Sequence, residues 1–123
     1  MRVLAGVAVF LVGAIHGGIL VLEMFYWDHP IGREVFGMTP EESAVSAVLA
    51  ANQGLYNGFL AAGLFWGLLA NKRDVVMFFL LCVITAGVFG AVTAKPSILF
   101  TQASPAVIAL AFTLFSGRWA QTD

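Results

Sequence analysis

The run VLAGVAVFLVGAIHGGILVLEMFY, residues 3–26, is apolar along almost its whole length. A helix needs about 20 predominantly apolar residues to cross a bilayer, so this run is long enough to span a membrane. Three further apolar runs of similar length follow, at residues 46–70, 75–94 and 98–116. The sequence therefore predicts an all-α fold, an integral membrane four-helix bundle. It would form a single domain over residues 1–123, with helices at about 3–26, 40–70, 75–95 and 97–118.

The composition of the whole chain supports this prediction. Of its 123 residues, 60% are hydrophobic and only 11% are charged, whereas about a quarter of the residues in soluble proteins are charged. A soluble domain of this size could not bury so much apolar surface. The apolar runs make membrane lipids expected partners. The formal net charge of -1 and the lack of a basic stripe mean that nucleic acid is not an expected partner.

Basic residues set the expected orientation in the membrane. With four spans, both ends of the chain and the connection between the second and third helices lie on one side. That side carries more basic residues, Arg2, Lys72, Arg73 and Arg118, than the other side, which carries Arg33 and Lys95. Because basic residues are enriched in cytoplasmic loops, the N- and C-termini are expected in the cytoplasm.

Residues 28–43 are expected to be the one sizeable segment outside the membrane. They are interpreted as a loop interrupted by Pro30, Gly32 and Gly37. At the end of this loop, the stretch TPEE at residues 39–42 predicts the start of the second helix. Thr39 is placed as the N-cap, Pro40 at the first helical position and Glu42 to complete a capping box.

Pro105 predicts an irregular segment early in the last helix. It cannot donate a backbone hydrogen bond to the carbonyl of Thr101, and its ring disfavours a straight helix. A kink, or a short broken segment at residues 97–104, is the expected result. Polar backbone freed at membrane depth is tolerated only against protein or water.

Ionisable and amide side chains interrupt the first two apolar runs. His16 and Glu23 are two helical turns apart, so they share one face of the first helix. In the second helix, a spacing of four residues places polar side chains along two edges, one with Asn52 and Tyr56 and the other with Gln53 and Asn57. At a rise of about 1.5 Å per residue, all of them fall in the outer half of the membrane. Because ionisable groups in a membrane usually face a cavity, the sequence predicts an outward-facing pocket between these two helices.

The candidate roles follow from the chemistry of the side chains. His16 and Glu23 are the candidate catalytic residues, since an imidazole with a pKa of about 6.5 can act as acid or base and a carboxylate can hold or polarise it. The candidate ligand-binding residues would orient a carbonyl, hydroxyl or epoxide oxygen. They are Asn52, Gln53, Tyr56, Asn57, Trp27 and Gln102.

Structural explanations compete for the same residues. Glu23 could reach water at the membrane surface. His16 could fix helix packing through a hydrogen bond to Asn52 or Gln53. The amide side chains could form hydrogen bonds between helices without binding a ligand. Small residues also recur at every fourth position of the second helix, at Ala50, Gly54, Gly58 and Ala62. Such a ladder predicts close packing of helices, within one bundle or between copies of the chain. A homo-oligomer is expected because a four-helix chain this small has little interior.

Three stretches carry a resemblance to a known family: HGGILVLEMFYW at 16–27, PIGREVFGM at 30–38 and LAANQGLYNGFLAAGLFWGL at 49–68. They are similar to the small bacterial membrane proteins grouped as domain of unknown function 1304, and the resemblance covers most of the chain. It implies a four-helix protein of the bacterial inner (cytoplasmic) membrane and no particular activity. A fainter similarity is to small membrane epoxide isomerases that bind haem. Their haem-ligating histidine would fall near Asn52, and His16 is the residue that could replace it.

Four functions remain open on the sequence alone. The first is binding of a small lipophilic molecule, which the protein could also isomerise by proton transfer. The second is a small proton-coupled multidrug-type transporter, which the membrane glutamate in the first helix resembles. The third is haem or metal binding with His16 as a ligand, and the fourth is a structural accessory subunit.

Overall fold

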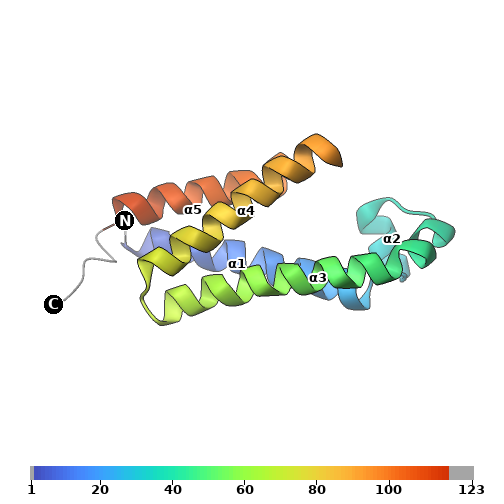
Figure 1. Ribbon diagram of the computed structural model, residues 1–123, viewed down its shortest axis with the longest axis horizontal. Helices are drawn as coiled ribbons and strands as arrows, with labels where there is room; N and C mark the ends of the chain where they lie inside the picture. Colours follow the sequence, from blue (N-terminus) through green and yellow to red (C-terminus); the bar gives the residue numbers. More distant parts are fainter. Residues whose placement is uncertain (1, 117–123) are drawn as a thin grey trace. The chain divides into compact units, whose positions relative to one another are not determined.

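The computed structural model describes residues 2–116, and all regular structure in that range is helical (Figure 1). The all-α prediction is therefore confirmed. Arg118, which was counted in the charge bias, lies outside the described residues. The elements are α1 (Arg2–Phe25), α2 (Pro30–Phe36), α3 (Pro40–Leu69), α4 (Arg73–Thr93), a π-helical segment η1 (Leu99–Ala103) and α5 (Ser104–Phe115).

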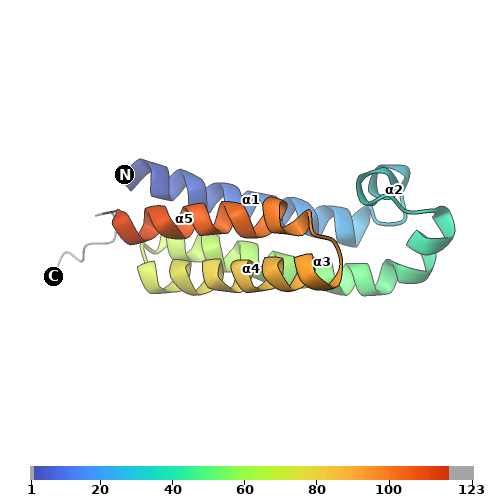
Figure 2. The ribbon, with the colours of Figure 1, turned by 90° about the horizontal axis from the view of Figure 1, so that it is seen from above.

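The helices group into two compact units. One consists of the described parts of Met1–Gly13 and Ala62–Asp123, and the other of Ala14–Ala61. In the first unit, α4 packs along η1 and α5 (Figure 2). The fully buried apolar side chains of this unit are small or branched groups from four helices, Ala5, Val9, Leu64, Val76, Leu80, Val83, Ala106 and Ala109.

Length and composition distinguish α1 and α4 from the other helices. Within residues 2–116, these two are long enough and apolar enough to cross a membrane. Segment Leu99–Phe115 is apolar but shorter. The longest helix, α3, is less apolar than α1 and α4. It carries Glu41 and Glu42 in its first turn and the amides Asn52, Gln53 and Asn57 farther along.

The irregular segment expected at residues 97–104 is a π-helical turn. The backbone N–H of Ser104 donates to the carbonyl of Leu99, five residues earlier, and the Ser104 hydroxyl donates to the same oxygen at 3.0 Å. Pro105 follows directly, near the start of α5. The wider turn lets the chain continue as a helix past a residue that lacks a backbone donor.

The interpretation of residues 28–43 as a loop was wrong, because the segment contains α2. His29 is its N-cap and accepts a 3.2 Å hydrogen bond from the backbone N–H of Ile31, while Pro30 takes an early position where no donor is needed. Gly37 ends the helix in the left-handed conformation, with φ of 68°. Two of the three residues interpreted as breakers, Pro30 and Gly37, are thus the start and stop signals of a short helix, and the third, Gly32, is buried inside it.

The capping box at the start of α3 is confirmed. The backbone N–H of Thr39 donates to Glu42 Oε2 at 2.8 Å, and the backbone N–H of Glu42 donates to Thr39 Oγ1 at 3.2 Å. These reciprocal bonds satisfy two backbone donors that the first turn of a helix leaves without partners. They also fix where α3 begins.

A three-residue clasp holds the connection from α1 to α3. Arg33 Nη2 lies 2.6 Å from Asp28 Oδ1, and Arg33 Nε donates to Ser43 Oγ at 3.0 Å. The hydroxyl of Ser43, which is fully buried, donates to Asp28 Oδ1 at 2.6 Å. The hydrogen bond from Ser43 and then that from Arg33 hold the pKa of Asp28 below its usual range.

In the second unit, α1 and α3 approach closely because glycines on α3 face α1. A Cβ atom at Gly54 would lie 2.8 Å from Met24 Cγ and 2.9 Å from Glu23 Cβ. One at Gly58 would lie 2.3 Å from Leu20 Cδ1. The ladder of small residues therefore serves packing within the chain at these two positions.

We expect valine at Gly54 to destabilise the fold by about 1–3 kcal/mol, because the added methyl groups overlap α1 and force the helices apart. Ala44→Val is the matched control. Ala44 is exposed on the same helix, so its change should cost only the helix propensity of valine, below about 1 kcal/mol. Unfolding of the purified protein, followed by circular dichroism, measures both. Equal losses in the two variants would contradict the close approach.

Acidification should loosen the clasp. A carboxyl group whose pKa is lowered by folding stabilises the folded state at any pH above its unfolded-state pKa of about 3.9. This stabilisation is lost as the pH falls through the lower pKa of the folded state. Hydrogen-exchange protection factors of residues 28–43 should therefore fall below about pH 4. Asp28→Asn should already show reduced protection at neutral pH and lose little more in acid. If the protection factors of Asp28→Asn and of the wild type fell equally in acid, the loss of protection would come from groups other than Asp28.

Candidate functional site

The candidate site begins with a hydrogen bond between α1 and α3. Asn57 Nδ2 donates to Glu23 Oε2 at 2.9 Å, and the same nitrogen donates to the backbone carbonyl of Gln53 at 3.2 Å. Glu23 and Asn57 are both half-buried. A carboxylate taken out of water needs donors, and the Asn57 amide is one that the fold brings to it. The bond therefore fixes one carboxylate oxygen of Glu23 against α3.

Next to this bond lies an open groove of about 270 Å³. Its lining combines three polar side chains with three apolar ones, Glu23, Trp27, Ser46, Leu49, Ala50 and Gln53. Trp27 is held in place by two contacts. Its Nε1 donates to Ser46 Oγ at 2.9 Å, and its ring centroid lies 4.7 Å from that of Phe36 in α2. The groove thus has a carboxylate, an amide and a positioned indole on its walls.

Four of the predicted site residues come together here. Glu23, Trp27 and Gln53 line the groove, and Asn57 holds Glu23 from the side. The edge of α3 that carries Gln53 and Asn57 is therefore the edge that faces α1.

The other predicted residues lie elsewhere. His16 is buried, with 1% of its surface exposed, and is not part of the groove lining. Two helical turns separate it from Glu23, roughly 10 Å along the axis. Asn52 and Tyr56 are exposed on a different edge of α3, and the Tyr56 ring packs against Phe59. Gln102 is half-buried in η1, which belongs to the other compact unit.

The sequence prediction missed three lining residues, Ser46, Leu49 and Ala50. Their signal was available, because positions 46, 49, 50, 53 and 57 follow the helical period and fall on one face of α3. In the sequence, Ser46 is only the first residue of the apolar run at 46–70. In the structure it also fixes Trp27.

No metal-binding cluster is formed by the part of the chain that the structure describes. Among residues 2–116, no three side chains of His, Cys, Asp or Glu are placed to hold one ion. His16 as a ligand of haem or of a metal therefore stays a prediction from the sequence.

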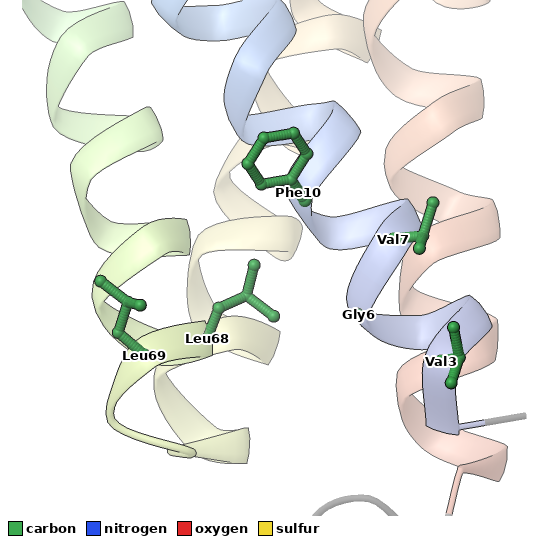
Figure 3. Close-up of a pocket in the computed structure, with 6 residues that line it drawn as sticks. All are labelled: Val3, Gly6, Val7, Phe10, Leu68 and Leu69. Carbon is green, nitrogen blue, oxygen red and sulfur yellow. The ribbon is translucent and has the colours of Figure 1, made fainter.

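A second hollow, of about 360 Å³, lies between the start of α1 and the end of α3 (Figure 3). It is larger than the groove, but its lining consists of Val3, Gly6, Val7, Phe10, Leu68 and Leu69. Without a polar side chain it offers shape alone and cannot orient a polar group. The groove at Glu23 is the better candidate for recognition because it combines apolar walls with a few polar groups.

Comparison with known proteins places the chain in a family. Residues 10–114, which include the whole groove and Asn57, match the family described as "Protein of unknown function (DUF1304)". The chain is also 32% identical over 101 residues to the "Uncharacterized protein YpaA" of Lactococcus lactis subsp. lactis (strain IL1403), an alignment that covers 79% of this chain and 85% of that protein. No solved structure matches the chain. The resemblance seen in the sequence is thus confirmed, and the chain belongs to the DUF1304 family.

Proposed function

We propose that this protein is an integral protein of the bacterial inner membrane that binds a small lipophilic molecule in the groove at Glu23. The apolar helices α1 and α4 support insertion in the membrane, and α3 and the segment Leu99–Phe115 complete four spans in this proposal. The bias of basic residues supports cytoplasmic termini. With that orientation the groove opens toward the outer side.

The observation that carries the proposal is the pairing of a half-buried carboxylate with apolar walls in one groove. A charged group within a spanning helix is costly, by about 2.5–3.5 kcal/mol at the membrane centre on insertion scales. One hydrogen bond from Asn57 leaves further acceptor positions on the Glu23 carboxylate. A bound molecule could use them.

The chemistry of the lining indicates the class of ligand. A carboxylate accepts hydrogen bonds and attracts positive charge, and the face of an indole such as Trp27 attracts cations. Leu49 and Ala50 offer apolar contact to the rest of the molecule. The groove therefore suits a lipophilic compound that carries a hydrogen-bond donor or a positive charge.

Binding is better supported than catalysis by His16. Proton transfer requires the acid or base to be within hydrogen-bond reach of its substrate, and His16 does not line the groove. Isomerase-like chemistry in this groove would have to use Glu23 itself. The same carboxylate would serve a proton-coupled transporter, which exchanges a proton for a cationic ligand on one acidic group.

We expect Glu23→Gln to weaken the binding of a lipophilic cation, with tetraphenylphosphonium as the probe, by roughly tenfold or more, because the carboxylate charge is lost. Glu34→Gln, an exposed change on α2, is the matched control and should leave the affinity unchanged. Equilibrium binding to the purified protein measures both. Equal affinity in wild type and Glu23→Gln, or no binding by the wild type, would contradict the proposal.

Uptake of the same probe into proteoliposomes separates binding from transport. Uptake that depends on a proton gradient and is lost in Glu23→Gln would identify a transporter. Binding without uptake would identify a binding protein or an enzyme.

A further inference from the structure

The short helix α2 packs directly on the backbone that carries Trp27. Gly32 lies in the middle of α2 and is buried. A Cβ atom at this position would overlap the carbonyl oxygen of Tyr26 and lie 2.9 Å from that of Trp27, so only glycine allows the approach. The rings of Tyr26 and His29, nearly perpendicular and 5.3 Å apart between centroids, add a second contact. Helix α2 is therefore seated on the residues that follow α1, among them the one whose indole lines the groove.

Phe36 extends this contact to the indole itself. It lies one helical turn after Gly32, and its ring is tilted by 42° against that of Trp27. The indole nitrogen is fixed separately, because Ser46 Oγ donates its hydrogen to the carbonyl of Glu42 at 2.6 Å and is left to accept from Trp27 Nε1. A hydrogen bond at the nitrogen alone would leave the ring free to swing about it. The contact with Phe36 removes this freedom.

The clasp holds α2 in the place where this contact can form. Asp28 directly follows Trp27, and its carboxylate binds both Arg33 of α2 and Ser43 of α3. Ser43 precedes Ser46 by three residues, so both serines lie on one face of α3. The clasp and the indole are therefore attached to the same two stretches of chain.

The connection that contains α2 is longer than two neighbouring helices require. About 2–8 residues commonly join packed helices, whereas residues 26–39 join α1 to α3. This length is ordered by a buried glycine, two aromatic contacts and a charged clasp. Long ordered connections are commonly functional, and the one groove residue that this connection contains and touches is Trp27.

We infer that α2 controls the affinity of the groove at Glu23, with Phe36 as a positioning residue that acts through the Trp27 indole. The inference rests on the proposed function of the groove. With α2 in place, the indole is fixed as a groove wall before a ligand arrives, so binding does not have to order this side chain. With α2 released, every binding event has to order the indole again. The coupling is reciprocal, because a ligand that needs the positioned indole stabilises α2 in turn.

The motion of the indole tests the positioning without a ligand. Trp66→Phe and Trp119→Phe leave Trp27 as the single tryptophan of the chain. In this background we expect Phe36→Ala to speed the local rotation of the indole, measured by time-resolved fluorescence anisotropy. Val35→Ala is the matched control, because Val35 is 58% exposed on the same helix, and it should leave the rotation unchanged. Equal rotation in the two variants would overturn the inference.

A double-mutant cycle tests whether Phe36 acts through Trp27. Phe36→Ala should raise the dissociation constant of tetraphenylphosphonium by about twofold to tenfold, the worth of one aromatic contact. In a Trp27→Leu background, the same change should have no further effect, since the group that Phe36 positions is gone. An equal rise in both backgrounds, or none in either, would overturn the inference. Absence of binding by the wild type would instead contradict the proposed function.

Ser43→Ala tests the clasp, because it breaks the bonds to Asp28 and Arg33 without a change of charge. We expect the dissociation constant of the same probe to rise by about twofold to tenfold, the worth of one hydrogen bond, and the Trp27 indole to rotate faster. Ser97→Ala, an exposed change in the other compact unit, is the matched control and should alter neither quantity. Unchanged rotation and affinity in Ser43→Ala would overturn the role of the clasp.

Discussion

A carboxylate on an apolar helix has to be satisfied by the chain itself, and in this protein the Asn57 amide does so across 2.9 Å. That bond can form only if α1 and α3 approach closely. Glycines at positions 54 and 58 remove the side chains that would hold the helices apart. The open groove is a result of the same approach, because larger residues on the same face, Leu49 and Gln53, stand beside the point of close contact. The polar bond and the groove thus both depend on the close approach of α1 and α3 that Gly54 and Gly58 allow.

The helix α3 divides its polar side chains between two edges with different environments. The edge with Gln53 and Asn57 is used inside the chain, where Asn57 donates to Glu23 and Gln53 lines the same groove. The edge with Asn52 and Tyr56 is exposed and continues an apolar stripe of regular period.

Local signals in the sequence predicted local structure well. Thr39 and Glu42 satisfy each other within one turn, so their capping box could be recognised from spacing alone. The need of Glu23 for a partner on the second helix was likewise predictable, since a charge in an apolar run demands one. The short helix α2 was missed because Pro30 and Gly37 were weighed as breakers of a loop. Their order, proline first and glycine last, is the order of a helix start and stop.

The choice between the two edges of α3 could not be predicted from the spacing of the polar residues. Asn52 with Tyr56 and Gln53 with Asn57 have the same interval, and one residue of rotation exchanges them. The glycine positions decide the matter, because they determine which face can come close to α1. His16 shares a helix face with Glu23, yet the groove lies at the Glu23 end and does not extend two turns back along α1.

The π-helical turn at Leu99–Ala103 makes the start of the last helix tolerant of a change in chain length. Such a turn holds one residue more than an α-helical turn, so loss of one residue there restores an ordinary helix without rotating the rest of α5. The buried side of α5, with Ala106, Ala109 and Thr113, would keep its direction. A deletion inside α5 would instead turn every later residue by about 100° and carry this side away from its neighbours. Relatives that are one residue shorter are therefore most easily accommodated at this turn.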